Sequence, residues 1–206
     1  MNVSERPTSE DTRARIMEVA WDLFRELGVR ATVADIAARL GMSSANVYRF
    51  FPSKQSLCEA VAAHQLEAMS AAALEIASAG GPAGERLRAV LLTLFQAMRD
   101  QMTNQARVHE IVDIALRERW AAITAYEQRM TGVIAGIIAA GQRSGEFGPG
   151  VVEELAAQTM CACCGIHHPM MIALYDRPDS LVPPDLIVDF ALRALTNGAP
   201  NPGSPA

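Results

Sequence analysis

Apolar residues recur every three or four positions along most of this chain, which is the spacing of one face of an α-helix. The pattern is clear in residues 12–28, which end in Gly28, a common helix stop; the apolar positions there are Ile16, Val19, Ala20, Leu23, Phe24 and Leu27. Strictly alternating apolar and polar positions, which would indicate strands, are nearly absent. The pattern therefore predicts an all-α protein.

Two short helices are predicted after the first. Thr32 can cap "VADIAARL", which carries an aspartate at the position that a capping box requires. Gly41 ends this helix, and Ser43 or Ser44 can cap "SANVYRFF", which Pro52 closes because the residue before a proline avoids helical angles. Two helices joined by such a tight turn form a helix-turn-helix, whose second helix enters the major groove of DNA.

The rest of the chain is predicted to form longer helices. Ser53 caps one that runs from Lys54 to about Ser78, and "SAGGPAG" at 78–84 is the clearest linker. Later helices are expected at 84–101, 105–117, 119–143, 151–175 and 185–196. The chain then divides into a flexible N-terminus (1–11), the helix-turn-helix domain (12–58), a second helical domain (59–196) and a disordered tail (197–206) that is poor in apolar residues.

The second helix of the motif, within "MSSANVYRFFPSK", mixes aromatic and cationic residues. Val47 and Phe51 are expected to face the core, which leaves a polar side for DNA; its members are Ser44, Ala45, Asn46, Tyr48, Arg49 and Phe50. Asn46 can bind adenine through its amide or can simply be solvated. Tyr48 can donate to a phosphate or can cover the core.

Two residues outside this helix also suit phosphate contacts. Thr32 caps its helix, and the free amides at that helix N-terminus can meet a phosphate as well. Lys54 lies in the first turn of its helix, where a cation is unfavourable with the helix dipole, so its charge needs another partner. A DNA phosphate would serve.

The charge of the chain limits the class of protein but does not exclude DNA binding. The net charge is −5, which argues against a nonspecific polycation but not against a local basic face. Residues 1–60 hold eight Lys and Arg against eight Asp and Glu, and residues 61–206 hold ten against fifteen. The N-terminal part is thus neutral and the remainder acidic.

One apolar stretch, Leu155–Tyr175, has no formal charge and is long enough to span a bilayer. It carries Gln158, Thr159, His167, His168 and Pro169, which a membrane centre penalises, so a helix buried in protein is the better interpretation. The N-terminus has no apolar signal region, and the cysteines lack the spacing of a secreted disulfide framework. A cytoplasmic protein without membrane contact is expected.

The segment "CACCGIHH" raises the question of a metal or thiol sensor that would use Cys161, Cys163, Cys164, His167 and His168. Ligands on consecutive turns of one helix rarely reach tetrahedral geometry, and cysteine is often a plain core residue. Core packing is favoured, with redox sensing and metal binding as alternatives. No metal or cofactor is expected, and a helical enzyme lacks support because no nucleophile, base and orienting group occur at a recognisable spacing.

A small-molecule pocket is suggested by flexible apolar residues with a few polar groups among them. The alternative is that these side chains are ordinary core. The candidates are Met98, Met102, His109, Trp120, Tyr126, Met130 and His167.

Residues 12–60, which include "ATVADIAARLGMSSANVYRFFPSKQSL", resemble the N-terminal domain of TetR-type transcriptional repressors. The resemblance implies an Ω-shaped homodimer that binds a palindromic double-stranded DNA operator and is released by an unidentified small-molecule inducer. By family position Thr32, Ser44, Asn46, Tyr48 and Lys54 would contact DNA, and Ser43, Ala45, Arg49 and Phe50 complete the candidate surface. Ala45, Asn46 and Phe50 depart from the residues common in the family, so the operator sequence is not implied.

The resemblance also implies roles for the C-terminal helices. The middle helices would surround the ligand, and the last two would form the interface between the two copies. The interface residues expected on this basis are Val152, Leu155, Met160, Cys164, Ile187, Phe190 and Leu195.

Overall fold

The computed structural model describes residues 8–104, 107–175 and 182–197, and the side chains of 102–104 and 173–175 are outside that description.

The first helix begins with a complete capping box. Thr8 and Asp11 exchange hydrogen bonds of 2.9 and 3.0 Å, so that α1 (Ser9–Leu27) begins three residues before the expected start. Gly28 ends it with a positive φ of 61°.

The predicted short helices and their ends are confirmed. After the 3₁₀ turn η1 (Gly28–Arg30), Thr32 caps α2 (Val33–Leu40), and Ser43 caps α3 (Ser44–Phe50). Phe51 is extended before Pro52, as the proline requires. The fourth helix, α4, runs from Lys54 to Ser78 as predicted.

The later helices agree with the prediction except in one region. The expected helix 151–175 is three pieces, because the residue before Pro169, His168, has an extended ψ of 126° and Cys163 also leaves the helical region. No single helix spans Leu155–Tyr175. The elements are α5 (Ala83–Asn104), α6 (Val108–Arg117), α7 (Ala121–Ser144), α8 (Val152–Ala162), α9 (Cys164–His167), α10 (Pro169–Tyr175) and α11 (Pro184–Asn197).

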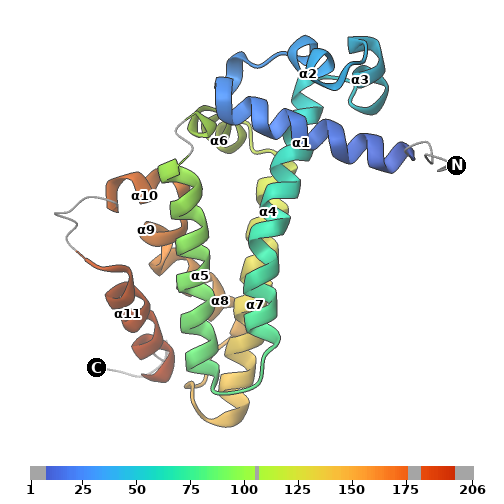
Figure 1. Ribbon diagram of the computed structural model, residues 1–206. Coiled ribbons are helices and arrows are strands. Elements are labelled where there is room, and N and C mark those ends of the chain that lie inside the picture. The colour runs from blue at the N-terminus through green and yellow to red at the C-terminus, as the bar shows by residue number, and fades with distance from the viewer. Residues whose placement is uncertain (1–7, 105–106, 176–181, 198–206) are drawn as a thin grey trace, which may run out of the picture. The chain divides into compact units, whose positions relative to one another are not determined.

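The described residues contain helices and no strands, so the all-α prediction is confirmed (Figure 1). None of these helices combines the length and apolar character needed to cross a bilayer. Most of the expected flexible N-terminus and the expected disordered tail, residues 1–7 and 198–206, lie outside the described residues.

Two compact units divide the chain. The first comprises Met1–Leu66 with Gln105–Ile123, and the second comprises Glu67–Asn104 with Thr124–Ala206. The helix-turn-helix therefore shares its unit with α6, a segment of the predicted second domain. Ile111 and Ala115 of α6 are buried in the same core as Ile16 and Phe24 of α1.

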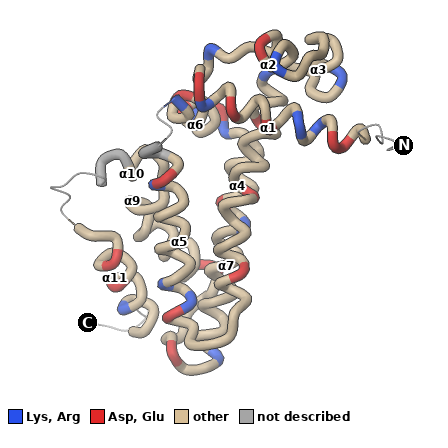
Figure 2. The backbone as a smooth tube through the Cα atoms, viewed as in Figure 1, with Lys and Arg blue, Asp and Glu red and all other residues tan. Residues whose placement is uncertain are grey.

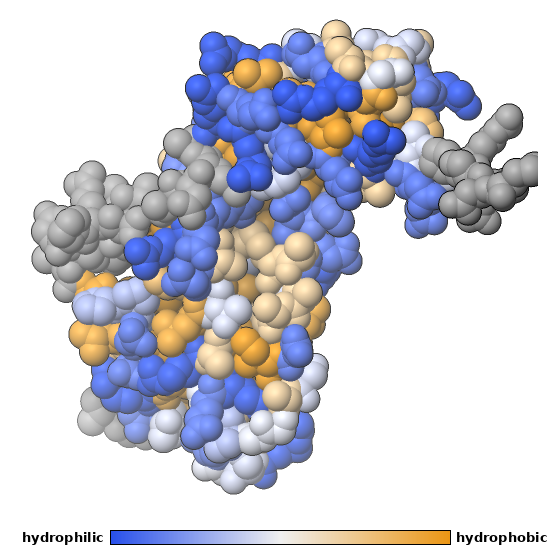
Figure 3. All heavy atoms as spheres, viewed as in Figure 1, coloured by the Kyte–Doolittle hydropathy of each residue, from blue (hydrophilic) through white to orange (hydrophobic). Residues whose placement is uncertain are grey.

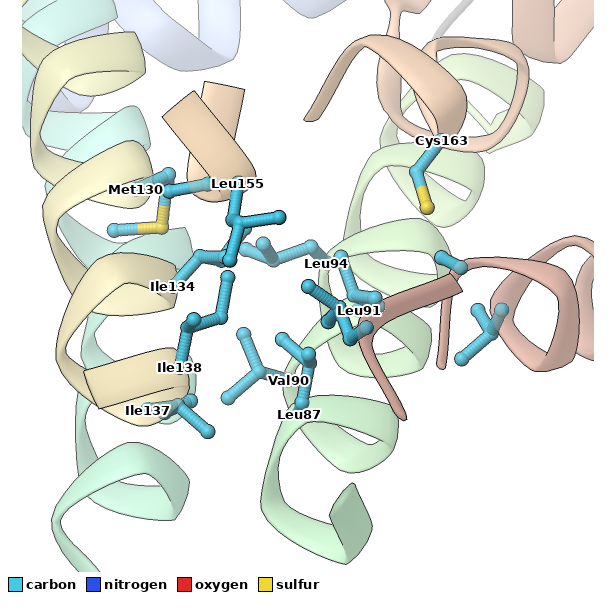
Figure 4. Packing of buried hydrophobic residues seen from close by; sticks show 14 of the residues in the cluster. Leu87, Val90, Leu91, Leu94, Met130, Ile134, Ile137, Ile138, Leu155 and Cys163 are labelled. Carbon is cyan, nitrogen blue, oxygen red and sulfur yellow. The ribbon is translucent and has the colours of Figure 1, made fainter. Parts of the chain in front are cut away.

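The core of the second unit lies between α5, α7 and α8 (Figure 4). The facing side chains are Leu87, Val90, Leu91 and Leu94 of α5, Met130, Ile134, Ile137 and Ile138 of α7, and Leu155 of α8. On its other sides α5 contacts α9, α10 and α11. The Glu146 carboxylate accepts the backbone N–H groups of Ala83 and Gly84 at 2.9 and 3.0 Å, so a residue after α7 caps the start of α5.

Candidate nucleic-acid interface

A three-residue turn, Gly41 to Ser43, sets the direction of α3 relative to α2. Gly41 has φ 66° and ψ 32°, the left-handed conformation in which a side chain is strained. No atom lies within 4 Å of a Cβ placed there, so backbone conformation rather than crowding favours glycine. The turn is closed by the Met42 N–H, which donates to the Ala37 carbonyl at 3.0 Å.

The α3 helix has one buried side and one exposed side. Val47 is fully buried and Phe51 is 2% exposed, which confirms the predicted core positions, whereas Tyr48 is 47% exposed. Ala45 and Arg49 are also exposed, and Ser44 and Asn46 are half-buried. Phe50 is half-buried and packs against the core, so it has less surface to offer DNA than Tyr48.

Asn46, the candidate base reader, contacts Arg49 of the same candidate surface. Arg49 Nη1 lies 3.5 Å from Asn46 Oδ1, and Asn46 Nδ2 lies 3.7 Å from the Met42 sulfur. The contact with Arg49 is long and exposed, and the contact with Met42 is partly buried and uses a weak sulfur acceptor. A base edge that hydrogen bonds to Asn46 would replace weak partners rather than strong ones.

Both predicted caps are formed by side-chain hydrogen bonds. Thr32 Oγ1 accepts the Asp35 N–H at 3.1 Å and donates to Asp35 Oδ2 at 2.6 Å. The side-chain hydrogen bond from Thr32 is the main reason that the pKa of Asp35 lies below its ordinary value. Ser43 Oγ accepts the Asn46 N–H at 3.2 Å.

Lys54 has a protein partner that the sequence did not reveal. Its Nζ lies 2.5 Å from the Val29 carbonyl oxygen in η1, so the ammonium links the start of α4 to the turn after α1. An ammonium has three N–H donors, and the remaining donors can still meet a phosphate.

Arg13 also touches the recognition helix, and sequence reasoning missed it. Its Nη1 donates to the Phe50 carbonyl at 3.1 Å, and its guanidinium carbon lies 4.2 Å from the centre of the Phe51 ring. The contact joins the start of α1 to the last turn of α3. Only the tertiary structure places these segments together, because 37 positions separate Arg13 from Phe50 in the sequence.

Charge on the motif is sparse. Arg49 is the one cationic residue in the sequence of α3, Arg39 lies near the end of α2, and Lys54 begins α4. Figure 2 shows the positions of Lys and Arg along the chain. The Glu26 carboxylate pairs with Arg39 at 2.9 Å. Arg39 thus pairs with a carboxylate and Lys54 with a backbone carbonyl, whereas Arg49 has, among the described residues, only a long contact of 3.5 Å to the side-chain amide of Asn46.

The side chains expected to line a ligand pocket are divided between the two units. Trp120 lies in the core of the first unit, where its Nε1 donates to Glu118 at 2.9 Å, and His109 is half-buried in that unit. Met98, Tyr126, Met130 and His167 belong to the second unit, and the side chain of Met102 lies outside the described residues. Burial raises the pKa of Tyr126 to about 12, so its phenol stays protonated well above neutral pH.

The cysteine and histidine cluster shows features of core packing. Cys163 is fully buried, and burial raises the pKa of its thiol to about 11. His167 Nε2 lies 2.8 Å from the Met160 carbonyl, and burial lowers the pKa of this imidazole. Within 8–104, 107–175 and 182–197, no three His, Cys, Asp or Glu residues are arranged to hold a metal ion.

The expected dimer residues differ in how much surface they expose. Leu155 and Leu195 are buried in the core of their own chain, so little of their area is left for a partner. Phe190 on α11 is 62% exposed, and Leu186, one turn earlier, is 54% exposed. Figure 3 shows apolar surface over α11. The other candidates, Val152, Met160, Cys164 and Ile187, are half-buried.

Most of the chain matches models of known protein families. Residues 16–61 match the family model "Bacterial regulatory proteins, tetR family", and residues 83–188 match "Tetracyclin repressor-like, C-terminal domain". A curated relative, the HTH-type transcriptional repressor KstR2 of Rhodococcus jostii (strain RHA1), is 27% identical over 159 residues, which cover 73% of this chain and 78% of the relative.

Two solved structures share the fold. A transcriptional regulator from Cytophaga hutchinsonii is 21% identical with a TM-score of 0.70, and the match covers 88% of this chain and 97% of that one. A transcriptional regulator from Saccharomonospora viridis, solved in complex with choline, is 22% identical with a TM-score of 0.61, and the match covers 92% of this chain and 95% of that one. At these identities the likeness shows the fold alone.

Proposed function

Because the chain belongs to the TetR family of bacterial transcriptional regulators, we propose that it is a repressor that binds a palindromic operator as a homodimer and leaves it when a small molecule binds. Family membership establishes a DNA-binding transcription factor rather than an enzyme, as the sequence predicted. Repression is supported by the curated relative, which is named as a repressor.

The observation that carries the proposal is the two-sided recognition helix. Val47 and Phe51 fix α3 to the core, and the same short helix exposes Tyr48 and Arg49 on its other side. A helix held in this way can enter the major groove without losing its packing. In this proposal Asn46 and Arg49 contact base edges.

The phosphate contacts come from residues around α3. Tyr48 supplies an exposed hydroxyl, and Thr32 and Ser43 are exposed side chains at helix starts. Lys54 adds a cation that is already positioned by the Val29 carbonyl. These contacts would set the register of the protein on DNA and would make its affinity depend on salt.

The direct test is selection of genomic fragments by the purified protein, followed by a footprint across a salt series. The proposal expects a protected palindrome whose half-sites are about 34–36 Å apart. Arg49→Ala should relax selectivity at one position of each half-site and cost about 1–3 kcal/mol of discrimination. Arg25→Ala removes an equal charge from an exposed position on α1 and should leave selectivity unchanged.

Two results would contradict the assignment. Binding that stays nonselective at every salt concentration, with and without reductant, would refute the proposal that the protein recognises a specific operator. Equal selectivity in Arg49→Ala and wild-type protein would remove Arg49 from the base readers, and the same experiment with Asn46→Ala tests the other one.

The proposed dimer rests on α11. Val188, Ala191 and Leu195 fill its buried side, and Leu186 and Phe190 add an exposed apolar side one turn apart. A helix that is apolar on two sides needs a second partner. We assign that partner to a second copy, which a palindromic operator also requires.

The proposed inducer site lies among the side chains of the second unit. Tyr126 offers a half-buried phenol, and Met130 lies one turn later on the same helix, so that an apolar wall and a polar group occur together. The choline complex of the Saccharomonospora viridis regulator supports a small molecule as the effector. A compound that raises the melting temperature of the protein and releases it from operator DNA would be identified as the inducer. If that compound has a polar group, Tyr126→Phe should weaken its binding.

A further inference from the structure

The first unit contains a groove that the DNA-binding and effector roles do not use. It lies between α1 and α4 and has a volume of about 290 Å³. Met17 and Trp21 of α1 and Val61 of α4 supply its apolar surface, and Glu18, Asp22 and His64 supply polar groups. The size falls at the lower end of the range for small-molecule sites.

The polar groups on the α1 side are both acidic. Glu18 and Asp22 are one helical turn apart, so their carboxylates share the groove side of α1, and both residues are exposed. Arg25 lies 3.8 Å from Asp22 in a solvent-exposed pair, which neutralises little of the charge. In the described part of the chain Glu18 forms no ion pair. Two like charges on one turn repel each other, and a bound cation would relieve that repulsion.

Trp21 adds the second element of cation recognition. It is half-buried, packs against the core of the first unit and lines the groove between the two acidic residues in sequence. Among side chains tryptophan attracts a cation over its ring face most strongly, and recognition of quaternary ammonium groups uses this interaction. Met17 and Val61 complete an apolar surface that a strongly hydrated metal ion would not use.

We propose that this groove is a binding site for a small hydrophobic organic cation, such as an aromatic quaternary ammonium compound. The ammonium group lies near Glu18, Asp22 and the Trp21 ring, and the apolar part covers Met17 and Val61. This site is separate from the proposed inducer site, because all of its lining residues belong to the first unit. An acidic rim disfavours DNA and anionic ligands here.

The test is a titration of the full-length protein with benzyltrimethylammonium chloride, followed through the indole N–H resonances of its two tryptophans. The Trp21 resonance, assigned with Trp21→Phe, should shift and saturate below about 10 mM, and the Trp120 resonance should stay in place. Benzenesulfonate, an aromatic anion, should not shift Trp21. No saturable shift, or equal shifts with the two compounds, would refute the cation site.

Matched variants separate a site from general attraction to an acidic protein. Glu18→Gln with Asp22→Asn should weaken binding about fivefold, because each exposed charge contact contributes modestly. Glu75→Gln with Glu85→Gln removes the same charge from exposed positions outside the groove and should leave the affinity unchanged. Equal weakening in both double variants would overturn the proposal. Operator binding is measured separately, so the result does not depend on the proposed repressor function.

Discussion

Replacement of Gly141 by alanine should destabilise the second unit, although the same replacement elsewhere in α7 should stabilise it. A Cβ placed on Gly141 would lie 2.2 Å from Cδ2 and 2.6 Å from Cε2 of Phe147. Nonbonded carbons normally lie about 3.5–4.0 Å apart. Phe147 is buried, and its N–H donates to the Gly141 carbonyl at 3.1 Å, so the ring has little freedom to move aside.

A matched control isolates the cost of this contact. Gly136 lies in the same helix, and nothing lies within 4 Å of its Cβ position, so Gly136→Ala should raise the free energy of unfolding by about 1 kcal/mol through helix propensity. Gly141→Ala makes the same gain but adds overpacking of about 1–3 kcal/mol. The very short distances place the cost in the upper part of that range. The net result should be a loss of about 1–2 kcal/mol.

The assay is urea unfolding followed by circular dichroism, with all variants at one protein concentration because association would shift the midpoint. The urea concentration at the midpoint should be highest for Gly136→Ala, intermediate for the wild type and lowest for Gly141→Ala. The dependence of the free energy of unfolding on urea concentration should be the same for all three. If Gly141→Ala were as stable as Gly136→Ala, the Phe147 ring would not lie against α7 as described.

Three further outcomes follow from single contacts. Hydrogen bonds from the Ala83 and Gly84 amides lower the pKa of Glu146. The stabilising effect of this carboxylate is therefore complete above the pKa of the unfolded state and is lost as the pH falls through the lower pKa of the folded state. When the free energy of unfolding is measured at decreasing pH, it should decline less for Glu146→Gln than for the wild type. Arg13→Ala removes the donor to the last turn of α3 and should speed hydrogen exchange of backbone amides in α3 and weaken operator binding, whereas unchanged exchange would deny Arg13 a positioning role. Phe190→Glu should convert the proposed dimer to monomers in sedimentation experiments at micromolar concentration, and an intact dimer would move the interface away from α11.

The sequence predicted best those features that neighbouring residues determine. Thr32 and Gly41 are local signals, since a cap bonds to an amide three positions away and a left-handed turn depends on one residue. The core side of α3 followed from helical spacing. The break at His168 has a local cause in Pro169, whereas the departure at Cys163 has no sequence signal of comparable strength.

Features that depend on distant residues could not be predicted in this way. Periodicity showed that α6 has an apolar face but could not show that this face packs with α1, because both cores of the chain need the same residue types. The cap of α5 by Glu146 and the contact of Arg13 with Phe50 join positions far apart in the sequence.

Lys54 shows where reasoning from sequence reaches its limit. A cation at a helix start needs a partner, and that conclusion holds, since its Nζ lies 2.5 Å from the Val29 carbonyl. The sequence could not distinguish this carbonyl from a DNA phosphate, because either accepts a hydrogen bond from an ammonium. The two partners are compatible, and the carbonyl contact reduces the freedom that Lys54 would lose when a phosphate binds. A side chain that stabilises the fold can thus also be preorganised for DNA.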